Sequence, residues 1–170
     1  MTRLMLVMLL AVPAFADSFS PDIPDVEVVT HEGKKVRFYS DLVKGRTVAV
    51  NFIYTGCSTI CPSSGALFSA LQKQHESVQF ISISIEPEVD TPPKLAAWSR
   101  RFRTTPQWTL VTGSPAAIAK IVKAFGQTTA RPQDHTPLTI DGSDRTHTWS
   151  KLYGFPGSEK IADLIAEVSR

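Results

Sequence analysis

Residues 47–62 read TVAVNFIYTGCSTICP, and most of the expected architecture follows from them. The run Thr47–Tyr54 is nearly all apolar and rich in β-branched residues, which predicts a buried central strand. Pro62 fits the first turn of a helix, where its missing N–H needs no partner. These residues therefore predict a strand, a turn that carries Cys57, and a helix that follows directly.

Weaker patterns extend this unit on both sides. Before it, residues 26–29 and 35–38 alternate in polarity and predict a β-hairpin around Glu32 and Gly33. After it, helices and strands alternate: a helix over 66–71, a strand over 79–85, a helix from Pro92, a strand over 108–111 and a helix from Pro115.

The C-terminal part is expected to add a hairpin and a helix. Residues 138–140 and 145–152 are expected to pair around a turn at Asp141 and Gly142, and Ser158 is expected to cap the last helix. The whole order predicts an α/β fold: a thioredoxin-like mixed sheet flanked by helices on both faces, with an N-terminal β-hairpin. No internal domain boundary is evident, so residues 17–170 are expected to form one domain.

The first 16 residues look like a secretory signal peptide. Arg3 precedes an apolar run, Leu4–Val12, and Ala14-Phe15-Ala16 has the small-x-small pattern of a cleavage site. The run is about half the roughly 20 residues that a membrane-spanning helix needs. We therefore expect cleavage after Ala16, a periplasmic mature protein and no stable membrane insertion of that mature chain.

Charge and composition narrow the function classes. The formal net charge is +2, and no long run of one charge sign is present. Such a balance gives no electrostatic support for binding nucleic acid or an anionic membrane surface.

The chain has only two cysteines, Cys57 and Cys61, at the start of the predicted helix. Free N–H groups and the positive end of the helix dipole favour a thiolate there. Residues four apart are neighbours on a helical turn, so the sulfurs can form a disulfide or bind one metal ion. A disulfide closing so small a loop adds little stability, which favours a chemical role over two inert buried thiols.

The spacing separates two functional interpretations. Thiol–disulfide exchange enzymes normally have two residues between their cysteines, whereas three are present here. Two thiolates suit a soft ion such as Cu(I), and a third donor is sought among the four histidines. His31 lies in the first hairpin, His75 ends a helix and His147 lies in the second hairpin, whereas His135 lies in a loop that leads into a strand.

Several motifs together resemble the Sco/SenC family of thioredoxin-fold copper proteins, which assist cytochrome c oxidase assembly. Asn51–Cys57 with Cys61-Pro62 is similar to the copper motif of that family. Ile85–Pro92 is similar to its Asp-Pro-x-x-Asp-Thr-Pro stretch, with Glu86 where the family has Asp. Asp134-His135 resembles the Asp-His pair that supplies a distant histidine ligand.

The resemblance implies copper, as Cu(I) or Cu(II), held by Cys57, Cys61 and His135. It also implies delivery of copper to the binuclear copper site of a respiratory oxidase, or maintenance of the thiols of that site. The recipient would be an oxidase subunit or another periplasmic copper protein. The alternative is a periplasmic thiol–disulfide oxidoreductase, in which the two cysteines are catalytic and act on the cysteine pair of a partner. A metal carrier is favoured over an enzyme.

Three smaller expectations accompany this interpretation. Asp134 is a candidate to fix the tautomer of His135, and Glu86 either supports the metal site or is structural. Thioredoxin folds commonly place a cis proline opposite the cysteines, so by resemblance we expect a cis Thr136–Pro137 bond, although only about 5–6% of X–Pro bonds are cis.

The mature N-terminus is predicted to be Asp17, because the cleavage pattern ends at Ala16. Mass spectrometry of protein recovered from the periplasm checks this. An intact Met1 form held in the membrane would contradict it.

Overall fold

Eight strands form one mixed sheet in the computed structural model, which describes residues 17–127, 134 and 136–170. Their order across the sheet is β1-β8-β7-β4-β5-β6-β2-β3. The strands are β1 (Asp17–Ser18), β2 (Glu27–Thr30), β3 (Lys35–Arg37), β4 (Thr47–Ile53), β5 (Gln79–Ser84), β6 (Trp108–Thr112), β7 (Leu138–Ser143) and β8 (Thr148–Tyr153). The expected signal peptide, residues 1–16, lies outside the described residues.

The centre of the sheet is the strand that the sequence predicts. All seven residues of β4 are buried. It pairs in parallel with β5 and antiparallel with β7, and β5 continues in parallel to β6. The expected N-terminal hairpin is confirmed by the antiparallel pairing of β2 and β3. A mixed sheet of the expected class results.

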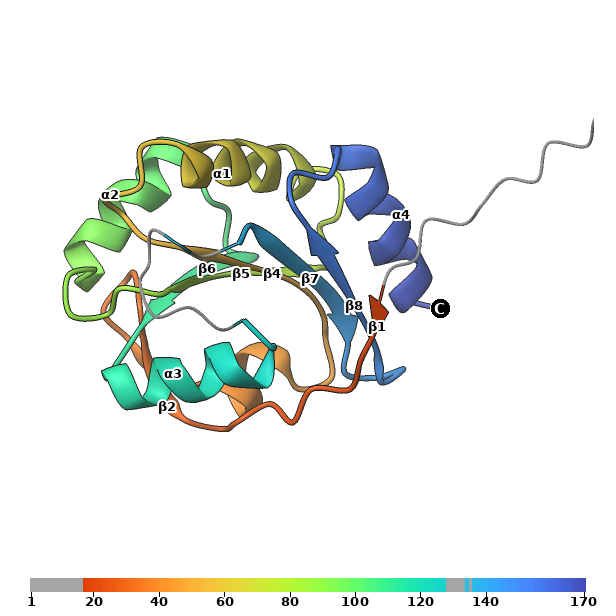
Figure 1. The fold of residues 1–170 in the computed structure, drawn as a ribbon, viewed down its shortest axis with the longest axis horizontal. Helices are drawn as coiled ribbons and strands as arrows, with labels where there is room; N and C mark the ends of the chain where they lie inside the picture. Colours follow the sequence, from red (N-terminus) through yellow and green to blue (C-terminus); the bar gives the residue numbers. More distant parts are fainter. Residues whose placement is uncertain (1–16, 128–133, 135) are drawn as a thin grey trace, which may run out of the picture.

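Helices cover both faces of this sheet, as expected (Figure 1). The helices α1 (Ile60–Leu71), α2 (Pro92–Phe102) and α4 (Ser158–Val168) lie on one face. The helix α3 (Pro115–Ala124) and a short helical segment, η1 (Phe38–Val43), lie on the other. Within the described ranges, no helix is both long and apolar enough to cross a membrane.

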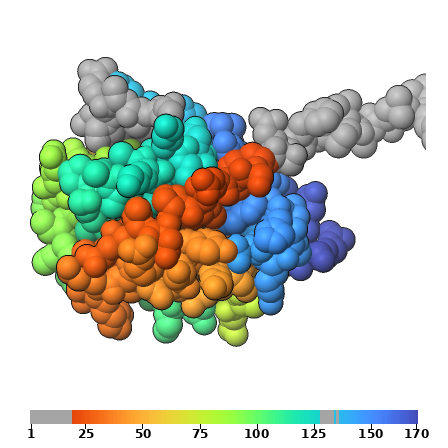
Figure 2. Space-filling view, turned by 90° about the horizontal axis from the view of Figure 1, so that it is seen from below, coloured from red at the N-terminus to blue at the C-terminus, as the bar shows by residue number. Residues whose placement is uncertain are grey.

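The N-terminal lead-in adds a layer to the second face. Figure 2 shows this segment crossing the face beside α3. Phe19, Ile23 and Val26 pack against the hydrophobic cluster on that side, and the Phe19 ring meets Trp149 edge-on at 6.5 Å. The lead-in therefore covers part of the apolar surface on this side of the sheet.

The helix starts follow local sequence signals with one exception. Ser114 caps α3 by accepting the N–H of Ala117 at 3.2 Å, and Thr91 precedes the first prolines of α2. The expected cap of α4 is wrong by one residue. Ser158 is the first helical residue, and Gly157 before it takes the extended backbone of a cap.

The expected turn at Asp141 and Gly142 is also wrong. Both residues lie inside β7, and the chain turns after Ser143, with His147 in the left-handed conformation at φ 56°. Gly142 faces Trp149 across the β7–β8 pair, and a Cβ at position 142 would lie 2.0 Å from the indole ring. Position 142 is therefore a glycine because the Trp149 ring packs closely against its backbone, and not because the chain turns there.

The expected cis bond before Pro137 is wrong as well, because none of the peptide bonds among the described residues is cis. The trans form is the lower-energy one by about 0.5–1 kcal/mol for an X–Pro bond. It leaves the Thr136 carbonyl where the Gln127 side-chain amide donates to it at 2.7 Å.

The packing of Trp149 predicts the cost of a substitution at Gly142. Gly142→Ala should destabilise the protein by roughly 1–3 kcal/mol, because the added methyl overlaps a buried ring that cannot move freely. Urea unfolding measures this. Gly113→Ala is the matched control, since a Cβ there makes only ordinary contacts, at 3.5 Å and beyond. Equal stability of the two variants would contradict the packing argument.

Candidate metal centre

The two cysteines lie where the central strand gives way to the first helix. After β4 ends at Ile53, a turn closes with the Cys57 N–H donating to the Tyr54 carbonyl at 3.1 Å. Cys61 is the second residue of α1. The sequence therefore places the pair correctly, with Cys57 just ahead of the helix and Cys61 in its first turn.

The two side chains are in contact. The backbone N–H of Cys61 donates to the Cys57 sulfur at 3.3 Å, and the Thr59 hydroxyl lies 3.9 Å from that sulfur. Both cysteines are free thiols. Cys57 is 8% exposed, whereas Cys61 is 1% exposed. Cys57 is thus the member of the pair that reaches the surface.

This geometry makes the two thiols chemically different. Burial raises the pKa of Cys57, but hydrogen bonds from the backbone and thiol of Cys61 and from the Thr59 and Ile60 backbone outweigh it and lower that pKa to about 6. Burial raises the pKa of Cys61 to about 12, with further contributions from the Cys57 thiolate and Asp90. At neutral pH the pair therefore holds one thiolate, on Cys57, and one thiol, on Cys61.

Asp90 fixes the turn that precedes the cysteines. Its buried carboxyl group accepts the Thr55 N–H at 3.0 and 3.1 Å and the Thr55 hydroxyl at 2.5 Å. The same carboxyl accepts the hydroxyl of Ser84, the last residue of β5, at 2.7 Å. The sequence shows Asp90 only as a member of the Ile85–Pro92 motif, so this contact with the turn is a finding of the structure.

Tyr54 is a second residue that the sequence does not single out. Burial and a side-chain hydrogen bond with Cys57 raise the pKa of Tyr54 to about 12, and Glu86 adds to this through its charge. The phenol therefore stays protonated and faces the thiolate as a donor. Its position three residues before Cys57 is the only signal in the sequence that could have identified it.

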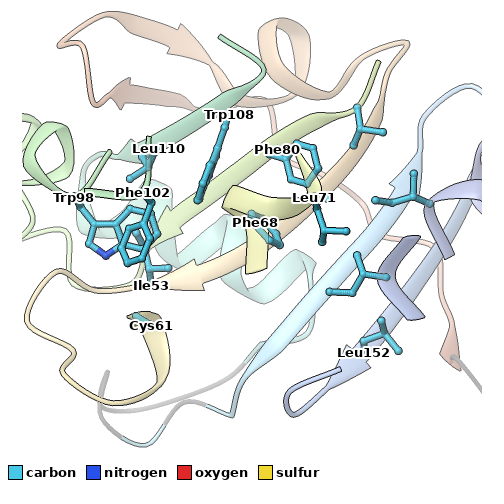
Figure 3. Packing of buried hydrophobic residues seen from close by; sticks show 14 of the residues in the cluster. Ile53, Cys61, Phe68, Leu71, Phe80, Trp98, Phe102, Trp108, Leu110 and Leu152 are labelled. Atoms are coloured by element: carbon cyan, nitrogen blue, oxygen red, sulfur yellow. The ribbon is translucent and has the colours of Figure 1, made fainter. Parts of the chain in front are cut away.

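Aromatic rings enclose the inner side of the pair. Cys61 lies at the edge of a cluster that includes Ile53, Trp98 and Phe102 (Figure 3). Gly65 on α1 permits this packing, because a Cβ there would lie 2.8 Å from Trp98 and 2.9 Å from Phe102. The enclosure accounts for the burial of Cys61.

The other residues expected at the site are His135, Asp134 and Glu86. His135 lies outside the described residues, so its place relative to the cysteines stays a prediction. Asp134 is exposed, and the backbone N–H of Glu86 donates to the Ser84 hydroxyl at 3.2 Å. Across residues 17–127, 134 and 136–170, no three His, Cys, Asp or Glu side chains gather as a metal site.

Another histidine has a structural role instead. The Nδ1 atom of His31 accepts the Leu110 N–H at 3.2 Å, which ties the first hairpin to β6. His147 lies in the exposed turn between β7 and β8.

Comparison with known proteins gives a consistent family match. A sequence model of the SCO1/SenC family matches residues 20–153. The chain is 29% identical over 124 residues to a SCO1 protein homolog of Bacillus subtilis, which covers 69% of this chain and 63% of that protein. It is 28% identical over 109 residues to a putative copper-binding protein of Stutzerimonas stutzeri, covering 61% of this chain and 52% of that protein.

A solved structure agrees over nearly the whole chain. A SCO1/SenC family lipoprotein from Bacillus anthracis superposes with a TM-score of 0.78 and 26% identity, covering 92% of this chain and 100% of that one. The matched regions span about half to two thirds of the length of the curated relatives, from 49% to 63%.

The thiol environment predicts the pH dependence of alkylation. Reaction of reduced protein with iodoacetamide should rise with pH through a midpoint near 6 and level off by neutral pH, because the lowered pKa makes Cys57 a thiolate there. Peptide mapping should find the label on Cys57. The Cys61→Ala variant is the control, and its midpoint should move upward because the donating thiol is gone. A wild-type midpoint near 8.5, that of an ordinary thiol, would contradict this account.

Proposed function

The chain belongs to the SCO1/SenC family, and we propose that it binds copper and delivers it to the binuclear copper site of a respiratory oxidase. The observation that carries the proposal is the placement of both cysteines at the start of α1, where the backbone N–H of Cys61 donates to the Cys57 sulfur at 3.3 Å. Copper is the cargo in this proposal, and the two sulfurs are its principal donors.

The donor set fits a soft cation. Cys57 supplies a thiolate at neutral pH, and Cys61 becomes a second thiolate when a metal displaces its proton. Thiolates favour soft ions such as Cu(I) over hard ions such as Mg²⁺ and Ca²⁺. The apolar wall of Trp98 and Phe102 keeps water from the inner side, which suits a weakly hydrated soft ion better than a hard one.

His135 is the proposed third ligand. This assignment rests on the resemblance of Asp134-His135 to the family motif. The position of the first residues of β7 supports this assignment. The strand β7 runs antiparallel to β4 and pairs Thr139 with Asn51, close to the end of β4 that leads to Cys57. Imidazole is a suitable partner for two thiolates on copper.

A protein recipient is supported by the surface at the same end of the sheet. In the part of the chain that the structure describes, the large hydrophobic side chains that stand exposed are Val89, Tyr153 and Phe155. Tyr153 ends β8 opposite Leu138, Phe155 follows it, and Val89 follows the end of β5, so all three lie toward the cysteine end of the sheet. Exposed apolar groups near a candidate site suit a protein contact surface.

Thiol–disulfide exchange is the second candidate function, and the unequal thiols favour it. A thiolate with lowered pKa that reaches the surface can attack a disulfide, and a neighbouring thiol can then resolve the mixed disulfide. The same pair could in this way reduce the cysteines of an oxidase copper site before metallation. Export with loss of residues 1–16 is part of both proposals, and it rests on the signal-like N-terminus.

Copper affinity distinguishes the roles of the three proposed ligands. Reduced protein should bind one Cu(I) per chain, measured anaerobically by competition with a chromophoric chelator. Cys57→Ser and Cys61→Ser should each weaken binding by roughly 100-fold or more, because a hard hydroxyl replaces a soft thiolate. His135→Ala should weaken it by about tenfold or more, equivalent to roughly 1.4 kcal/mol or more.

A matched histidine control separates ligation from a general effect. His147→Asn also removes one imidazole, and asparagine tolerates the left-handed backbone of that turn, so copper affinity should stay unchanged. If His135→Ala binds as tightly as wild type, the third-ligand proposal is wrong. If the disulfide form binds Cu(I) as tightly as the reduced form, the cysteine assignment is wrong too.

A further inference from the structure

An open cleft lies beside the cysteine turn, on the side of α2. It has a volume of about 310 Å³ and is lined by Thr55, Lys94, Ala97, Trp98 and Arg101. Thr55 belongs to the turn that Asp90 holds, two residues before Cys57. The other four residues repeat at helical spacing and form one face of α2. The cleft therefore adjoins the candidate centre without including either thiol.

The walls of this cleft carry unpaired positive charge. Lys94 and Arg101 are both exposed, and α2 contains no acidic residue. The ion pairs among the described residues are Lys34–Glu32, Lys35–Glu27 and Arg37–Asp25, and none of them involves this cleft. The Arg101 guanidinium lies over the Phe102 ring at 5.3 Å, which leaves its N–H donors available to a ligand.

The spacing of the two cations indicates what kind of anion fits. Lys94 and Arg101 lie seven positions apart on one helix, which corresponds to roughly 10 Å along its axis. At that separation each cation can bind a different carboxylate. An extended chain with acidic side chains can supply both carboxylates, while its apolar stems rest on Trp98 between the two charges.

We propose that this cleft binds an acidic segment of the partner protein, next to the cysteine that the partner presents to Cys57. The inference rests on the proposed function, because it names the chemistry of the protein that meets the same thiols. Charge complementarity then aligns the two proteins and increases the rate at which the sulfurs meet. Lys94 and Arg101 act as specificity residues and take no part in the sulfur chemistry.

A disulfide-exchange assay reads this recognition directly. The probes are two short synthetic peptides, each with one cysteine held as a mixed disulfide with 2-thiopyridine. Glutamates flank the cysteine in the acidic peptide, and glutamines flank it in the neutral one. The Cys57 thiolate attacks the peptide sulfur, the old S–S bond breaks, and thiopyridine leaves and takes a proton from water.

In the second step of the exchange reaction, Cys61 resolves the mixed disulfide between Cys57 and the peptide. Cys61 loses its proton to solvent and attacks the Cys57 sulfur, which releases the peptide thiol and leaves a Cys57–Cys61 disulfide. The protein loses two electrons in all. They reduce the starting mixed disulfide to one thiopyridine and one peptide thiol. Release of thiopyridine, followed by absorbance, therefore reports the rate of the first attack.

Charge reversal provides the test. Wild type should react faster with the acidic peptide at low salt, and Lys94→Glu/Arg101→Glu should lower the acidic-to-neutral rate ratio about tenfold. Lys120→Glu/Lys123→Glu changes the net charge equally on exposed positions of α3, across the sheet, and should change that ratio less than about twofold. Lys94→Gln/Arg101→Gln removes the two charges without reversing them, so its acidic-to-neutral rate ratio should lie between those of wild type and the double-glutamate variant. Circular dichroism checks that each variant is folded.

The outcomes separate this inference from the proposed function. If wild type reacts with both peptides at equal rates, the cleft inference is wrong while the thiol chemistry stands. If neither peptide reacts, the exchange role fails and the inference fails with it. If both double-glutamate variants lower the ratio equally, net charge rather than the cleft is responsible. If millimolar free glutamate removes the preference, the cleft is a site for small acids and the partner segment is excluded.

Discussion

The buried carboxyl group of Asp90 is the constraint on which the candidate site depends. It accepts hydrogen bonds from the backbone and hydroxyl of Thr55 and from the hydroxyl of Ser84. These contacts join the end of β5, the start of α2 and the turn after β4. A buried polar group is costly unless its hydrogen bonds are satisfied, so the carboxyl favours this one arrangement of the three segments. The turn after β4, held in this way, places Cys57 against the first N–H groups of α1.

The difference between the two thiols follows from that placement. Cys57 lies ahead of the helix and receives backbone N–H groups, whereas Cys61 lies inside the first turn against Ile53, Trp98 and Phe102. One sulfur is therefore charged and reachable, and the other is neutral and enclosed. The same asymmetry suits two uses: a soft metal site that gains its second thiolate on loading, and a nucleophile with a resolving thiol. Metal transfer and thiol exchange need not be alternatives, since both start from the same reduced pair.

Local patterns predict much of the fold and the cysteine pair, because the decisive interactions are close in sequence. The apolar run of β4, the proline near the start of α1 and the Ser114 cap are all signals that act within a few residues. Contacts between residues that are distant in the sequence could not be predicted in this way. Gly142 looks like a turn residue, but it lies in β7 because the Trp149 ring needs the space. The contacts of Asp90 with Thr55, and of Tyr54 with Cys57, likewise form only after strands and helices are in place.

The most direct test of this account is the number of protons released when Cu(I) binds to the reduced protein. Anaerobic titration in a weakly buffered solution near neutral pH, followed with a pH electrode, measures that number. The account predicts about one proton per copper, because Cys57 is already a thiolate and Cys61 still holds its proton before binding. Release of two protons would mean that both thiols begin protonated. Binding without proton release would mean that Cys61 is not a thiolate ligand, and either result would contradict the unequal pair on which the proposed function rests.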